Sequence, residues 1–263
     1  MSNNIRNNVG EIIRSRSVLF ALLRKDLIGR YKNSVLGFAW HFVMPIIMIC
    51  VYYIVFSEIR TAPMDNFVIY LAIGLFLFNF MITCLSNGSA CITNNAPMIK
   101  KMYFPRELIV FSQILSSLVV FIIGYTVTIT LMIIVGMKVD FIPIIISIYV
   151  VMCAILFTTG YVLIFASLTV YKRDVHYFLS SITMVFFFIT PIYFNPKDVS
   201  GSLNTIVWLN PYTYYVNSMH ITLFYNQIPE KHLLIGCTIL AVLSIIVGYT
   251  VFNKLKRGFA ERL

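Results

Sequence analysis

Long apolar runs alternate with short polar connections along most of the chain. A helix needs about 20 mostly apolar residues, at roughly 1.5 Å rise per residue, to cross about 30 Å of hydrocarbon. The runs that meet this requirement cover residues 37–57, 67–88, 108–136, 141–170, 176–194 and 233–252. The pattern predicts an all-α fold: a polytopic membrane protein with six transmembrane helices.

Two prolines fall inside these apolar runs. Pro45 lies within the first run and Pro191 lies near the end of the fifth. Proline has no backbone N–H and its ring clashes with the preceding turn, so we expect it to kink or end each helix. The third and fourth runs exceed the minimum length, and we expect these helices to be tilted or to project beyond the lipid.

Lys and Arg are distributed unequally between the two sides of these spans. Sixteen of the 20 lie in residues 1–36, the second-to-third connection, the fourth-to-fifth connection and the tail. The opposite side holds Arg60, Lys138, Lys197 and Lys231. Because cytoplasmic loops carry the excess of basic residues, both termini are predicted to be cytoplasmic, which agrees with an even number of spans.

Composition supports a membrane protein over a soluble one. The chain is 59% hydrophobic and 11% charged, whereas soluble domains carry about 25% charged residues. The net charge of +10 is divided among short clusters and forms no continuous basic face. Membrane lipids, and not nucleic acid, are therefore the expected partners of these charges.

Residues 1–36 form a predicted cytoplasmic segment that contains an interfacial amphipathic helix. Leu19, Leu23, Leu27 and Tyr31 repeat every four residues, whereas Arg14, Arg24 and Lys25 fall on other faces of the same helix. Such a helix lies in the plane of the membrane interface. A solvated basic tail is the alternative interpretation.

Two connections and the tail complete the predicted organisation around a six-helix transmembrane domain at residues 37–252. Segment 91–107 mixes basic and aromatic residues and is expected to protrude into the cytoplasm as a short helix broken by Pro97 and Pro105. Segment 195–232 is too long for a bare loop, which favours short external helices that dip into the membrane. Residues 253–263 form a cytoplasmic tail.

The sequence lacks the residues that several kinds of transport and enzyme chemistry require. The spans contain almost no ionisable side chains, which disfavours an ion-coupled carrier, although sodium sites made of backbone groups stay open. No two of the ten acidic residues lie within four positions of each other, which leaves a metal-dependent transferase without paired carboxylates. No GxxxxGK[ST] phosphate loop occurs. The five cysteines have no metal-ligand spacing and are interpreted as packing residues.

Six short strings, in order along about 240 residues, resemble one family. They are RKDLIGRYKNSVLGFAW at 24–40, KKMYFPRE at 100–107, KRDV at 172–175, TPIYF at 190–194, LNPY at 209–212 and the terminal FNKLKRGFAERL. This chain resembles the polysaccharide-exporting type 2 ABC transporter permeases, which serve O-antigen, teichoic acid and capsule export. The terminal string is most similar to O-antigen permeases of Gram-negative bacteria; a teichoic acid or capsule exporter is the alternative within the family.

The resemblance implies a function, partners and a location. The chain would be a permease without enzymatic activity in the cytoplasmic (inner) membrane. It would form a homodimer with two copies of a separate ATPase subunit, which binds the ATP and Mg, so that this chain binds no cofactor and no metal. The substrate would be a lipid-linked polysaccharide. The resemblance also implies a cytoplasmic coupling helix before the third span and two re-entrant external helices before the sixth.

The resemblance further assigns candidate ATPase-coupling residues. An aromatic and basic knob would fit into a cleft of the ATPase. Its residues would be Lys100, Lys101, Tyr103, Phe104, Pro105, Arg106 and Glu107. The alternative is that these basic residues only fix the topology of the loop. Arg173 and Asp174 form either a second contact with the ATPase or a simple charged turn.

Aromatic residues are candidates for a sugar conduit, because their faces can stack on sugars without fixed hydrogen bonds. The proposed conduit residues are Trp40, Tyr52, Tyr53, Phe76, Phe78, Phe186, Phe187 and Phe188. Aromatic residues near span ends, including Trp40, Tyr193 and Trp208, are also explained by the interfacial belts of membrane proteins. Some of the deeper aromatics are alternatively in contact with lipid alone.

Overall fold

The computed structural model describes residues 15–29, 39–59, 64–138 and 140–263. Within these ranges all regular structure is helical and no strand is present. Four helices in this part of the chain are long and apolar enough to cross a membrane. They are α4 (Phe67–Ser89), α7 (Glu107–Ile134), α8 (Phe141–Tyr171) and α12 (Lys231–Leu255). The second, third, fourth and sixth predicted spans are therefore confirmed as helices of spanning length.

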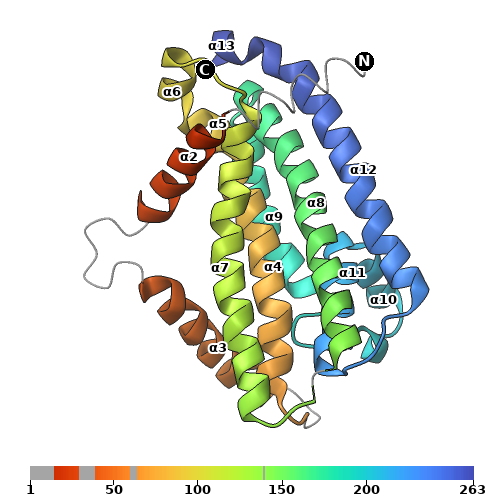
Figure 1. Ribbon diagram of the computed structural model, residues 1–263. Helices are drawn as coiled ribbons and strands as arrows, with labels where there is room; N and C mark the ends of the chain where they lie inside the picture. Colours follow the sequence, from red (N-terminus) through yellow and green to blue (C-terminus); the bar gives the residue numbers. More distant parts are fainter. Residues whose placement is uncertain (1–14, 30–38, 60–63, 139) are drawn as a thin grey trace.

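Helix α4 is the central element of the helical bundle. It packs against α7, α8, α9 and α11, and α3 contacts it as well (Figure 1). Every residue from Ile69 to Phe78 is buried. An apolar helix that is buried on all faces is held by close packing with its neighbours, because lipid offers no hydrophobic driving force between helices.

Helices α8 and α12 run side by side and approach closely at two glycines (Figure 1). A Cβ atom placed on Gly160 would lie 2.6 Å from the backbone nitrogen of Ile245. A Cβ atom on Gly248 would lie 2.8 Å from the Gly160 Cα. Small residues allow membrane helices to bring their backbones into contact, so these two positions determine the spacing of α8 and α12.

The first and fifth predicted spans correspond to helices with shorter apolar stretches. Helix α3 (Trp40–Ile59) continues through Pro45, and its apolar stretch covers Ile46–Phe56. Helix α9 (Asp174–Ile189) ends before the predicted limit at residue 194. Thr190 is extended, as expected for a residue that precedes a proline, and Pro191 therefore explains the early end of α9.

Short helices occupy the segment between α9 and α12, as the length of this segment predicts. They are η2 (Pro196–Asp198), α10 (Ser202–Leu209), α11 (Pro211–Met219) and η3, a π-helical turn (His220–Phe224). Helix α11 begins where the Asn210 side chain accepts a hydrogen bond from the Tyr212 N–H at 3.1 Å, with Pro211 in the first turn. Both features favour a helix start.

Two sets of short helices lie at different levels of the bundle (Figure 1). Helices α5 (Cys91–Asn94), α6 (Ala96–Lys101) and α13 (Phe259–Arg262) gather at one end. Helices α10 and α11 lie toward the opposite end, beside the first turns of α12. Basic residues of α6 and of the C-terminal segment therefore share one end of the molecule.

Helix α2 (Arg16–Gly29) packs against α7 near that end. Leu22 is its fully buried residue, whereas the predicted apolar row Leu19, Leu23 and Leu27 is half-buried. Phe20 and Ile28 are exposed, so α2 has an apolar face beyond its contact with α7. The predicted residues Arg14 and Tyr31 lie outside the described residues.

Candidate functional site

The predicted coupling segment consists of two short helices and an extended stretch before α7. Pro97 lies in the first turn of α6 and starts this helix instead of breaking it. After Lys101 the chain is extended at Met102, and α7 begins at Glu107 soon after Pro105. The segment lies at the end of the bundle where α13 is found (Figure 1).

The side chains of this segment divide into an exposed group and a buried group. Lys100 and Lys101 are exposed, and Tyr103 is 100% exposed. Phe104 and Glu107 are buried, at 8% and 2% exposed. Of the two adjacent aromatic side chains, Tyr103 is thus the one available to a partner, whereas Phe104 packs into the core.

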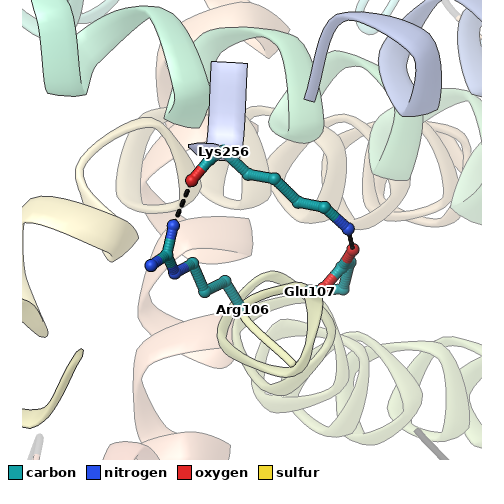
Figure 2. Close-up of polar contacts among 3 residues, drawn as sticks. All are labelled: Arg106, Glu107 and Lys256. Atoms are coloured by element: carbon teal, nitrogen blue, oxygen red, sulfur yellow. Dashed lines mark hydrogen bonds and ion pairs between the residues drawn. The ribbon is translucent and has the colours of Figure 1, made fainter. Parts of the chain in front are cut away.

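Arg106 and Glu107 face the C-terminal segment of the same chain (Figure 2). The Lys256 ammonium donates to Glu107 Oε1 at 2.6 Å, and Arg106 donates to the Lys256 backbone carbonyl. The Arg106 guanidinium also lies 5.6 Å from the centre of the Phe259 ring, in cation–π range. Both predicted coupling residues are therefore engaged within the chain.

Sequence reasoning missed Lys256 and Phe259 as members of this site. Phe259 is fully buried, and its ring centre lies 5.6 Å from that of Phe252. The available signal was the aromatic residue Phe259 in a basic tail. A tail that is only solvated does not require an aromatic side chain. Glu107 and Lys256 are 149 positions apart in the sequence. No local sequence pattern reveals a contact over such a separation.

Arg173 and Asp174 lie at the start of α9, and both are exposed. Arg173 borders a polar cavity of about 900 Å³, together with Lys25, Asn95, Gln113 and His176. Lys25 donates to Asn95 Oδ1 at 2.8 Å, which joins α2 to the start of α6. Arg173 thus lies near the coupling segment across this cavity, at the same end of the bundle.

Cys91 also borders the cavity, and its side chain is buried. Burial, with a smaller effect of Asp26, raises the pKa of the Cys91 thiol and keeps it protonated. Cys84, Cys153 and Cys237 are buried as well, and Cys50 is exposed. In the part of the chain that the structure describes, no group of three or more His, Cys, Asp or Glu side chains can hold a metal.

Five of the predicted conduit residues belong to one aromatic cluster, which joins α3, α4, α9 and α11. Ring centres lie 5.3 Å apart for Tyr52 and Phe187, 5.9 Å for Phe78 and Phe187, and 5.5 Å for Phe187 and Phe188. Tyr212 joins Phe78 at 5.8 Å and Phe186 at 5.1 Å. We call this set the aromatic cluster.

Sequence reasoning did not include Phe56, Tyr193 and Tyr212 in the conduit, although they extend the cluster. Phe56 stacks on Tyr193 with ring centres 4.2 Å apart. Tyr193 was interpreted as an interfacial residue, and Tyr212 lies in the segment predicted to be external. The turn at Pro191 brings Tyr193 to the cluster, and α11 brings Tyr212 there. The pattern of apolar residues along the sequence does not predict the position of either segment.

The structure also describes the other three predicted conduit residues, Phe76, Tyr53 and Trp40. Phe76 packs against Gly124 of α7, since a Cβ atom at that glycine would lie 2.7 Å from its ring. Tyr53 is 40% exposed and contacts Phe67, with ring centres 6.5 Å apart. Trp40 is half-buried at the start of α3.

Comparison with known proteins gives this architecture a family. Residues 17–224 match the family described as ABC-2 type transporter. The chain belongs to the ABC-2 type transporter family. It is a multi-pass membrane protein, and this family supplies the membrane subunit of a transporter.

Three relatives match this chain over nearly its full length. An O-antigen export system permease protein RfbA of Klebsiella pneumoniae is 30% identical, with 100% of both chains covered. A second such protein of the same organism is 28% identical over the same shares. The one of Myxococcus xanthus is 24% identical over 97% of this chain and 98% of its own length.

Proposed function

We propose that this ABC-2 family member is the permease subunit of a transporter that exports a lipid-linked polysaccharide, O-antigen above all, across the cytoplasmic membrane. The observation that carries the proposal is similarity to O-antigen export permeases over 100% of both chains. The order of the short strings from Arg24 to the C-terminus supports the same assignment. No phosphate loop is found in the sequence, so a separate subunit supplies ATP hydrolysis.

The proposal includes six spans with both termini in the cytoplasm. Helices α3 and α9 have apolar stretches shorter than the four long helices, and they cross the membrane as the first and fifth spans. The excess of basic residues at the end that holds α6 and η4 (Lys256–Gly258) supports a cytoplasmic position for that end. Helices α10 and α11 are then external re-entrant helices, and two copies of the chain form the transport pathway.

Docking of the ATPase takes place at the exposed half of the coupling segment in this proposal. Tyr103 presents a fully exposed ring beside the exposed Lys100 and Lys101. An aromatic side chain that fills a cleft of a partner contributes strongly to binding, and tyrosine is enriched among such residues. Arg173 and Asp174 provide a second contact at the same end.

The aromatic cluster is the proposed guide for the sugar chain. A moving polymer must not be bound tightly at any one point, because each strong hydrogen bond would trap it. Aromatic faces are weaker and tolerant contacts. Tyr52 and Phe187 are half-buried and Phe188 is 53% exposed, so part of the cluster is accessible in a single protomer.

Replacement of Tyr103 by alanine tests the docking surface. Tyr103→Ala should weaken co-purification with the ATPase and lower export to a similar degree, because truncation of a central interface residue costs about 2 kcal/mol or more. Phe141→Ala, which removes a 75% exposed ring at the start of α8 outside the proposed ATPase contacts, is the matched control. Normal ATPase binding and export by Tyr103→Ala at normal protein level would refute this surface.

A further inference from the structure

The C-terminal residues 255–262 bridge the start of α7 and the end of α8. On the α7 side, Lys256 pairs with Glu107, and Arg106 donates to the Lys256 carbonyl (Figure 2). On the α8 side, the Tyr171 hydroxyl donates to the Leu255 carbonyl at 3.0 Å. The Arg262 guanidinium lies 5.6 Å from the centre of the Tyr171 ring.

The Glu107–Lys256 ion pair is largely shielded from water, and the chain at Gly258 is closely fitted against α8. The Glu107 and Lys256 side chains are only 3% and 26% exposed. A Cβ atom on Gly258 would overlap the Tyr171 hydroxyl oxygen, so the chain passes directly against α8 at this glycine. Removal of one partner from a buried pair leaves an uncompensated charge, and the geometry of this bridge is therefore strongly specified.

The start of α7 and the end of α8, which the bridge connects, both lie next to the proposed ATPase contacts. Glu107 closes the stretch that begins with the exposed Tyr103, and Tyr171 directly precedes the connection that holds Arg173. The bridge itself continues directly from α12. A displacement of either contact can thus reach α12 through side chains that are in direct contact.

We propose that residues 255–262 act as a tie that makes the two ATPase-facing segments move with α12 as one body. Arg106, Glu107 and Lys256 are then positioning residues within the permease and not docking residues. The tie rests on the proposed docking of an ATPase at Tyr103. It accounts for a largely buried ion pair at the edge of a segment whose two lysines, Lys100 and Lys101, are exposed.

Charge reversal tests the tie in the complete transporter, reconstituted in lipid vesicles with its ATPase. Lys256→Glu and Glu107→Lys should each retain ATPase binding, because Tyr103 stays exposed. Polymer exported per ATP hydrolysed should fall by roughly fivefold or more, the lower range for coupled sites. The double exchange should restore most of that ratio. Lys254→Met, an exposed lysine in the last turn of α12, is the control and should export normally.

A milder variant decides the question if the reversed charges prevent folding. Arg106→Gln removes the bond to the Lys256 carbonyl and the contact with Phe259, and it leaves the Glu107–Lys256 pair intact. Its ratio of export to hydrolysis should also fall, at normal ATPase binding. An unchanged ratio in Arg106→Gln, or a double exchange that accumulates normally without restoring the ratio, would overturn the tie. Loss of ATPase binding in these variants would instead make Arg106 and Glu107 docking residues, which also overturns it.

Discussion

Position 160 accommodates only glycine, because the backbone of α12 occupies the space that a Cβ atom would need. The nearest backbone atoms belong to Ser244 and Ile245. Gly160→Val should therefore separate α8 from α12 and destabilise the protein by about 1–3 kcal/mol, as overpacking does in closely packed interiors. Thermal unfolding of the purified protein in detergent measures the effect.

Gly29→Ala is the control for this substitution, because among the described residues outside its own helical turn no atom lies within 4 Å of a Cβ atom built on Gly29. It should unfold at the temperature of the unchanged protein. If Gly160→Val also keeps that temperature and its normal level in the membrane, the close contact of α8 with α12 is not as described.

The aromatic cluster gives a second prediction at the residue scale. Tyr52→Ala and Phe187→Ala should each slow polymer export about two- to tenfold, since an aromatic contact contributes about 0.5–1.5 kcal/mol and 1.4 kcal/mol is a factor of ten. Surface polymer and membrane protein level are measured together, so that a folding defect is recognised. Phe141→Leu, at a 75% exposed ring at the start of α8, should have no effect.

The conduit hypothesis has a clear contrary outcome. Unchanged export and protein level in both alanine variants, and in the double variant, would make these side chains packing residues. A loss that appears equally in Phe141→Leu would indicate a general response of the membrane protein to aromatic loss. The hypothesis requires the effect to be confined to the aromatic cluster.

At the scale of elements, the sequence predicts the long helices well because one physical requirement determines them. Helix α4 covers Phe67–Ser89 where residues 67–88 were predicted, and α8 covers Phe141–Tyr171 where 141–170 were predicted. An apolar run of spanning length has few alternatives to a helix. The end of α9 was less well predicted, because Ile192 and Phe194 continue the apolar run beyond Pro191 although the helix does not.

Cysteine labelling tests the proposed placement of the elements across the membrane. In a version without native cysteines, Lys138→Cys and Ser202→Cys should react with an impermeant maleimide added outside intact cells. Lys100→Cys should react only after the membrane is opened. All three positions are exposed in the structure, so burial cannot explain a lack of reaction. Labelling of Lys100→Cys from outside would reverse the topology.

At the scale of the whole molecule, the contacts that sequence reasoning could not predict connect distant parts of the chain. His220 is fully buried and stacks on Tyr70, with ring centres 3.7 Å apart, and one of its ring nitrogens lies 2.9 Å from the Tyr70 carbonyl. The two residues are 150 positions apart. A one-dimensional pattern shows which side chains avoid water, but not which distant partner each one meets. The tie at Lys256 was missed for the same reason.

The central claim is that this chain moves a lipid-linked polysaccharide only when a separate ATPase works on it. The most direct measurement uses vesicles that contain the permease, its ATPase or both, with labelled O-antigen on its lipid carrier. Only vesicles with both subunits should move polymer across the membrane, and only with ATP and Mg²⁺. Movement driven by an ion gradient without ATP, or ATP hydrolysis by the permease alone, would contradict the account.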